Sequence, residues 1–257
     1  MMMSAPHRGA ALVTGAGKRL GRAMALALAK AGYDVALHFN SSGREARKLA
    51  DLLAAEGRRS ALLKADLARE DEVAPLIGEA KRLLGPLRLL VNSASVFEED
   101  DIETMTRESW ERHIAVNLRA PLRLAQDFAR AAEAGKDALI VNMLDQRVLK
   151  PTPQFLSYST SKAALFALTK TLAQALGPRN IRVNAIGPGP TLRNPRQSEK
   201  DWRRQNAATV LGRGAEPGDI AGALLYLIDA TAVTGQMIAV DGGQHLAWKT
   251  GDVLVKE

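Results

Sequence analysis

Short apolar segments alternate with helical patterns along the whole chain, and this alternation is the feature that most constrains the fold. The candidate strands lie at 10–14, 35–39, 60–64, 88–92, 138–143, 181–186 and 236–240. Helical periodicity fills 20–31, 44–55, 70–84, 107–132, 157–176 and 218–228. Successive strands joined by helices pair in parallel, because each helix carries the chain back across the sheet. The pattern predicts an α/β fold with a doubly wound parallel sheet of about seven strands and helices on both faces.

Length and composition agree with one soluble domain. The 257 residues, 46% of them hydrophobic, supply enough apolar surface for a single core, and we expect one domain over 1–257 with a disordered tail at 1–8. No stretch approaches the eighteen or so apolar residues of a spanning helix, and the first residues lack a signal core. We therefore expect no membrane association and a cytoplasmic location.

Charge and residue counts exclude several kinds of function. The net charge is +7, but aromatic residues are only 4% and the basic residues are spread along the chain. We therefore expect no nucleic acid, and a basic pocket for a polyanionic ligand is a simpler use of the charge. There are no cysteines, and the four histidines show no ligand spacing, so we expect neither disulfides nor a metal site.

A glycine-rich turn follows the first candidate strand and precedes a helix. Gly15 permits a tight turn, Gly21 allows close approach of the helix, and the helix N-terminus offers N–H groups to a pyrophosphate. The spacing is G-x-G-x-x-x-G, one residue longer than the common dinucleotide fingerprint, and a purely structural turn would share it. Its place after an apolar strand near the N-terminus favours a dinucleotide-binding, Rossmann-type fold.

Tyr158 and Lys162 are four residues apart, which places them within about 40° of each other on one helical face. An ammonium beside a phenol favours the phenolate, so we expect the tyrosine pKa to fall from about 10 toward neutrality. The hydroxyl would then exchange protons readily. A surface tyrosine near a solvated lysine would show the same spacing.

The glycine loop together with Tyr158 and Lys162 resembles the short-chain dehydrogenase/reductase family, and the resemblance covers nearly the whole chain. Further family landmarks occur in order: Asp66-Leu67, Asn92-Ser93-Ala94-Ser95, Asn117, the segment 186–191 with Pro188-Gly189, and 240–243. The resemblance implies that Asn117 anchors a water in a proton relay and that Lys162 holds the nicotinamide ribose. It also implies a mobile substrate loop at 188–207, although an ordinary surface excursion would have the same composition.

Within that family the chain looks most like the pteridine reductases, on three details. Arg19 fits that group's T-G-x-x-x-R-x-G loop, Asp145 stands where most of the family has a catalytic serine, and Phe97 matches an aromatic residue that stacks on the pterin. Two positions depart from the pattern: Ser93 replaces a second asparagine, and Asn40-Ser41 lacks the basic residue of some members. Asp145 would equally suit a loop cap or an ion pair with Arg147.

The resemblance implies three sets of site residues. The catalytic set is Asp145, Tyr158, Lys162 and Asn117. The substrate set is Arg19, Ser95, Phe97, Asp145 and Tyr158. The cofactor set is Gly15, Lys18, Arg19, Leu20, Asn40, Ser41, Ser42, Asp66, Leu67, Asn92, Ala94, Tyr158, Lys162, Pro188 and Gly189. NADPH is the expected cofactor, because residues 37–42 carry no acid to bind a ribose 2′-hydroxyl while Lys18 and Arg19 suit a phosphate.

The expected reaction is hydride transfer from the nicotinamide to a pterin ring carbon, with Tyr158 and Asp145 supplying the proton and Lys162 keeping Tyr158 acidic. An ordinary carbonyl reductase acting on a ketone, sugar or 3-oxoacyl thioester is the nearer alternative. A non-catalytic NADP-binding regulator is the farther one. The resemblance also implies a homotetramer packed through the alanine- and leucine-rich helices at 107–132 and 157–176, whose apolar faces would serve core packing equally well.

Overall fold

Seven strands form one parallel sheet in a computed structural model that describes residues 5–248. Its strand order is β3-β2-β1-β4-β5-β6-β7. The strands are β1 (Ala10–Val13), β2 (Asp34–Phe39), β3 (Ser60–Lys64), β4 (Leu87–Asn92), β5 (Ala138–Met143), β6 (Ile181–Pro188) and β7 (Met237–Val240). Each coincides with a predicted strand, so the doubly wound α/β fold is confirmed.

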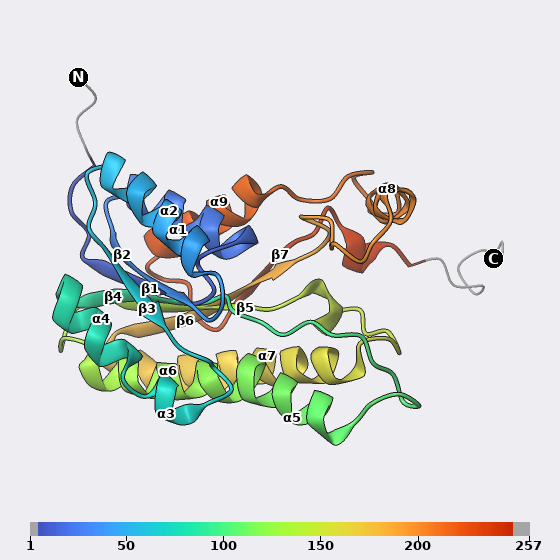
Figure 1. The fold of residues 1–257 in the computed structure, drawn as a ribbon, viewed down its shortest axis with the longest axis horizontal. Coiled ribbons are helices and arrows are strands. Elements are labelled where there is room, and N and C mark those ends of the chain that lie inside the picture. The colour runs from blue at the N-terminus through green and yellow to red at the C-terminus, as the bar shows by residue number, and fades with distance from the viewer. Residues whose placement is uncertain (1–4, 249–257) are drawn as a thin grey trace.

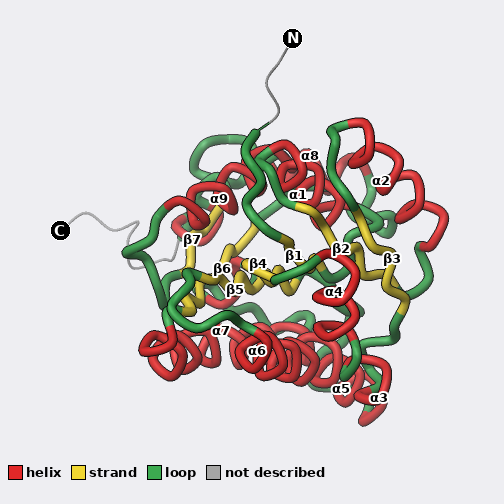
Figure 2. Tube along the Cα trace, turned by 90° about the vertical axis from the view of Figure 1, so that its left-hand side faces the viewer, coloured by secondary structure: helices red, strands yellow, loops and turns green. Residues whose placement is uncertain are grey.

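Helices cover both faces of this sheet (Figures 1 and 2). One face carries α1 (Arg19–Lys30), α2 (Gly43–Ala55) and α9 (Pro217–Asp229). The other carries α4 (Leu76–Leu84), α5 (Arg107–Ile114), α6 (Ala120–Ala131) and α7 (Leu156–Leu176). Two separate hydrophobic cores result, because side chains of a strand alternate between the faces: Leu12 enters one core and Val13 the other.

The order of the strands reverses beside β1, and this reversal positions the site. β1 pairs with β2 on one side and with β4 on the other, so the loops that follow β1 and β4 leave toward opposite faces. Ligands of open α/β sheets bind in the crevice at such a point, outside the carboxyl ends of the strands. The glycine loop and residues 93–97 both lie there.

Three predicted segments differ in detail. The helix predicted at 70–84 is divided into α3 (Glu70–Val73) and α4, with Pro75 at the start of α4. A π turn at Ala115–Arg119 interrupts the helix predicted at 107–132. The segment 188–207 ends in a helix, α8 (Glu199–Ala207), with Ser198 as its N-cap. No residue of α8 is buried, so it lacks the apolar stripe by which a helix is found in a sequence.

The predicted tail at 1–8 is shorter than expected. The Arg8 backbone N–H donates to the Gly32 carbonyl at 3.0 Å, and its guanidinium contacts Asp229 at 2.7 Å. His7 lies 3.3 Å from Asp34. Residues 5–8 are therefore attached to the sheet edge, and the remainder of the predicted tail, 1–4, lies outside the described residues. Between residues 5 and 248, no helix combines the length and apolarity needed to cross a bilayer.

Candidate active site

A cleft of about 910 Å³ opens along the carboxyl ends of the strands. With the exception of Asn92, its wall holds every residue predicted to bind cofactor or substrate: Gly15, Lys18, Arg19, Leu20, Asn40, Ser41, Ser42, Asp66, Leu67, Ala94, Ser95, Phe97, Asp145, Tyr158, Lys162, Pro188 and Gly189. Asn92 is 2% exposed and donates to Asn142 on β5 at 2.9 Å. Asn142 in turn donates to Thr169 on α7. Asn92 is not among the residues that line the cleft, and its predicted contact with the cofactor stays a prediction.

The glycine loop has the geometry of a phosphate cradle. Gly15 has φ +66°, and a Cβ on Gly21 would lie 2.3 Å from the Gly15 carbonyl oxygen. Only glycines fit these two positions. At Gly21, the first turn of α1 packs directly against the backbone of the glycine loop. Lys18, the N-cap of α1, makes no side-chain capping bond, and the first turn of the helix contains no acidic residue. The N–H groups there suit an anionic group such as a dinucleotide pyrophosphate.

The side chains of Tyr158 and Asp145 are in direct contact. The Tyr158 hydroxyl donates to Asp145 Oδ2 at 2.9 Å, while Asp145 Oδ1 accepts from the Arg147 backbone N–H at 2.8 Å. Asp145 therefore caps the short turn at Gln146–Val148 and holds the tyrosine with its other oxygen. Lys162 donates to the Met143 carbonyl at 2.8 Å, and its ammonium lies 5.7 Å from the centre of the Tyr158 ring. The carboxylate, phenol and ammonium form one group that lines the cleft, in which Tyr158 and Lys162 are buried and Asp145 is partly exposed.

Burial dominates the protonation of this group. It raises the pKa of Asp145 above the ordinary range and lowers the pKa of Lys162 to about 8. Burial also raises the pKa of Tyr158, and the neighbouring Asp145 carboxylate raises it further. The predicted acidification of Tyr158 by Lys162 is thus wrong for this structure, because desolvation and the adjacent carboxylate both oppose the phenolate. Tyr158 therefore holds its proton at neutral pH.

Asn117 lies behind the cleft wall, in the π turn, and is fully buried. Its Nδ2 donates to the Val96 carbonyl and to Ser161 Oγ, both at 3.0 Å, and its Oδ1 accepts from the Val96 N–H at 2.8 Å and from Ser95 Oγ at 3.1 Å. The side chain therefore ties the loop after β4 to the helix that carries Tyr158. Its predicted role in anchoring a water stays a prediction.

Aromatic rings in mutual contact line the cleft beside Asp145. The rings of Phe97 and Phe155 are 4.4 Å apart and 8° from parallel, and Tyr158 meets Phe97 edge-on at 4.6 Å. The Arg147 guanidinium lies 5.1 Å from the centre of the Phe155 ring, and Arg196 lies 5.9 Å from that of Phe97. The sequence analysis missed Phe155 and Arg196, and it considered Arg147 only as an ion-pair partner of Asp145.

Arg19 connects the glycine loop to the segment at 188–207. Its guanidinium donates to the carbonyls of Leu192 at 2.8 Å and Arg193 at 3.1 Å. Its backbone has φ +50°, a left-handed conformation that costs energy for a residue with a side chain. Arg196, within the same segment, donates to the Phe97 carbonyl at 2.6 Å. The segment thus closes over the cleft through two arginine contacts.

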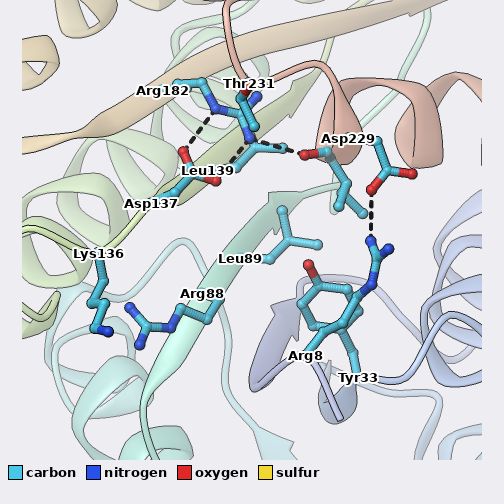
Figure 3. A pocket seen from close by; sticks show the side chains of 11 residues that line it. Arg8, Tyr33, Arg88, Leu89, Lys136, Asp137, Leu139, Arg182, Asp229 and Thr231 are labelled. Atoms are coloured by element: carbon cyan, nitrogen blue, oxygen red, sulfur yellow. Dashed lines mark hydrogen bonds and ion pairs between the residues drawn. The ribbon is translucent and has the colours of Figure 1, made fainter. Parts of the chain in front are cut away.

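A second cavity, of about 420 Å³, lies at the opposite, amino edge of the sheet (Figure 3). Its charged side chains mostly pair with one another: Arg182 contacts Asp137 at 3.0 Å, and Arg8 contacts Asp229 at 2.7 Å. Arg182 also donates to carbonyls at the end of α9. This pairing gives the cavity a structural role in joining strands to α9. Within residues 5–248, no three His, Asp or Glu side chains are placed to hold a metal ion.

The fold and the cleft define an α/β protein built to bind a dinucleotide, and comparisons with known proteins agree. A family model described as enoyl-(acyl carrier protein) reductase matches residues 15–245. The chain is 34% identical to a probable galactose dehydrogenase, GalD, of Rhizobium meliloti, over 90% of this chain and 93% of the relative. It is 31% identical to the 3-oxoacyl-[acyl-carrier-protein] reductase FabG of Staphylococcus epidermidis, over 92% of this chain and 98% of the relative.

A solved structure is more similar still. The crystal structure of FolM alternative dihydrofolate reductase 1 from Brucella suis, in complex with NADP, is 45% identical. It aligns with a TM-score of 0.92 over 97% of this chain and 99% of that one. The chain belongs to the short-chain dehydrogenase/reductase family, as its glycine loop, Tyr158 and Lys162 predicted.

Proposed function

We propose that the protein reduces the ring of a pteridine with NADPH. The observation that carries the proposal is the contact between the Tyr158 hydroxyl and the Asp145 carboxylate, 2.9 Å apart beside stacked aromatic rings. The likeness to a structure named an alternative dihydrofolate reductase supports it. The proposal builds on the more general conclusion that the protein is an oxidoreductase of the short-chain family.

A carboxylate suits a pteridine better than it suits a ketone. A ketone oxygen needs hydrogen-bond donors, whereas a pteridine presents ring N–H and amino groups that need acceptors. Asp145 offers such an acceptor, and its raised pKa brings proton transfer closer to neutral pH. Tyr158 holds its proton and would deliver it to a ring nitrogen when its hydroxyl turns from Asp145 to the substrate, which leaves the Asp145 carboxylate free to accept from the substrate N–H groups. Phe97 and Phe155 supply a flat apolar wall against which a bicyclic ring packs.

The cleft also fits the cofactor. When bound, NADPH would supply the hydride. The glycine loop and the start of α1 would hold its pyrophosphate, and Lys162 would hold the nicotinamide ribose. β2 ends at Phe39 and is followed by Asn40, Ser41 and Ser42, whose amide and hydroxyl groups would donate hydrogen bonds to a 2′-phosphate without the repulsion of an acid.

The nearer alternative is a reductase of ketones, sugars or 3-oxoacyl thioesters, and the names of the relatives GalD and FabG favour it. Steady-state rates should be measured with NADPH on dihydrofolate, dihydrobiopterin, a panel of ketones and a 3-oxoacyl thioester, and with NADP⁺ on galactose. The proposal expects turnover of a pteridine. Turnover of a ketone with none of any pteridine would contradict it, and tight NADPH binding without turnover would favour a regulator.

Asp145→Ser separates the two reactions within one protein, because serine is the residue that most of the family has here. We expect this change to lower pteridine turnover by about 10²-fold while NADPH affinity is retained. An improved rate on a ketone together with an unchanged rate on the pteridine would refute the assigned role. Asp51→Ser, an exposed position on α2, is the matched control.

The assembly and the location are also proposals. By resemblance to the family we propose a cytoplasmic homotetramer that acts on a small molecule. Light scattering at micromolar concentration should give four times the mass of one 27.6 kDa chain. A mass near that of one chain would contradict the tetramer.

A further inference from the structure

His38, the penultimate residue of β2, connects three segments that line the cleft. Its side chain is buried, with Nδ1 3.2 Å from the Gly15 backbone nitrogen and Nε2 3.1 Å from the Ala65 carbonyl oxygen. Its backbone carbonyl accepts from the Ala16 N–H at 2.9 Å. The glycine loop, the end of β2 and the residues after β3 therefore meet at one residue.

The partners of the imidazole determine its protonation. Gly15 N–H is a donor, so Nδ1 must be an acceptor, and the Ala65 carbonyl is an acceptor, so Nε2 must carry the hydrogen. A protonated ring would place a donor against the Gly15 donor. Burial lowers the pKa of His38 to about 4, although the nearby Asp66 carboxylate acts in the opposite direction. The neutral Nε2–H tautomer is thus the form that fits at neutral pH.

The two hydrogen bonds of the imidazole hold two segments that line the cleft, the glycine loop at Gly15 and the residues after β3 at Ala65. Gly15 has φ +66°, and the glycine loop turns toward α1 from this residue. The hydrogen bond of its N–H to His38 therefore holds the peptide plane at which the turn begins. Ala65 immediately precedes Asp66 and Leu67, which line the cleft next to Asn40. A small rotation of either peptide would move groups that face a bound dinucleotide.

We propose that His38 is a positioning residue for the dinucleotide, whose neutral imidazole holds the glycine loop and the segment 65–67 in the binding geometry. The proposal rests on the NADPH-dependent function proposed above. His38 itself contacts the cofactor cradle through Gly15 and Ala65 and takes no part in the chemistry.

Two substitutions separate the two hydrogen bonds of the imidazole. His38→Asn places Oδ1 near the position of Nδ1 and keeps an acceptor for Gly15, whereas His38→Gln places Nε2 near that of the ring Nε2 and keeps a donor for Ala65. We expect His38→Gln to raise the Kd for NADPH about tenfold, because the partly buried Gly15 N–H loses its partner. We expect His38→Asn to keep the Kd within about threefold of the parent. Both should lower the melting temperature.

Fluorescence titration with NADPH and thermal unfolding without it give the two readouts. His113→Gln is the matched control: His113 is also buried, but it contacts Ser109 and Glu98. It should lose stability and keep NADPH affinity. Equal Kd values for the two His38 variants would overturn the positioning role. A parent protein that fails to bind NADPH would instead overturn the proposed function and this inference with it.

A measurement on the unmodified protein keeps the inference testable if a variant does not fold. Nitrogen NMR of the His38 ring at pH 7 should show an unprotonated Nδ1 and a protonated Nε2, together with slow exchange of the Gly15 amide hydrogen. A charged ring, the opposite tautomer or rapid exchange at Gly15 would overturn the proposal.

Discussion

The hydroxyl of Tyr158 and the carboxylate of Asp145 share a hydrogen bond of 2.9 Å, although they come from different elements of the fold. Asp145 follows β5, and Tyr158 lies in the first turn of α7. The carboxylate raises the pKa of the Tyr158 phenol, because it destabilises the phenolate. Tyr158 is therefore protonated at neutral pH, which is the form that the proposed reduction requires.

Removing the Tyr158 hydroxyl tests the assignment of the proton donor. In Tyr158→Phe we expect kcat to fall by about 10²-fold or more, because no hydroxyl is left to deliver the proton. NADPH affinity, measured by fluorescence titration, should stay near that of the parent. Near-normal turnover on every accepted substrate would show that the proton comes from elsewhere.

The pH dependence of the rate should report Lys162. Its pKa is lowered to about 8, so the ammonium is charged below that pH and loses its charge as the pH rises through it. We expect kcat/KM to fall on the alkaline side of about pH 8 and Lys162→Ala to impair both turnover and NADPH affinity. Lys170→Ala, an exposed position on the same helix, should leave the profile unchanged. A flat profile between pH 7 and 10 would argue against a role for the ammonium.

Arg19→Ala should loosen the segment at 188–207. The change removes both hydrogen bonds from the guanidinium to the carbonyls of Leu192 and Arg193. We expect faster amide exchange over this segment and a several-fold higher KM for the substrate. Arg22→Ala, an exposed position one turn further along α1, serves as the control. Unchanged exchange at 188–207 would mean that Arg19 does not hold the segment.

Cofactor preference follows from the absence of an acid after β2. We expect NADPH to be favoured over NADH by at least about tenfold in kcat/KM, or about 1.4 kcal/mol. Asn40→Asp should reduce this ratio, because a carboxylate there repels the 2′-phosphate. Asn180→Asp, in an exposed turn before β6, should not change it. Equal efficiency of the parent with both cofactors would refute the prediction.

Phe97→Ala should raise the KM for a pteridine about fivefold, the equivalent of about 1 kcal/mol of stacking. Its effect on a small ketone should be smaller, since a ketone offers no ring to stack. Phe166→Ala, on α7 and outside the cleft wall, controls for the loss of an aromatic side chain. An equal effect of Phe97→Ala on both kinds of substrate would indicate that the ring only shapes the pocket.

The sequence predicted the seven strands and the glycine loop because their signals are local. A buried parallel strand is a continuous apolar run, and Gly15 is needed where φ is +66°. The contact between Asp145 and Tyr158 depends on two elements meeting in space, so family resemblance indicated it and spacing did not. The pKa of Tyr158 was mispredicted because burial, which only the folded structure reveals, outweighs the effect of Lys162.

Other features lacked any local signal. α8 has no apolar face, so periodicity could not find it. The role of His38 depends on Gly15 and Ala65, which lie 23 and 27 residues away in the sequence. Phe155 has φ +58° at the start of α7, a conformation that no pattern rule assigns to phenylalanine.

Arg182 lies at the amino ends of the strands, away from the cleft. Its guanidinium donates five hydrogen bonds, to Asp137 and to carbonyls at the end of α9. The Arg182 anchor and the cleft therefore lie at opposite ends of the strands. Substitutions at Phe97 or Arg196 would change the cleft and leave the hydrogen bonds of Arg182 in place, because neither residue contacts that anchor. The scaffold is thus well suited to acquiring new substrates by substitutions confined to one rim.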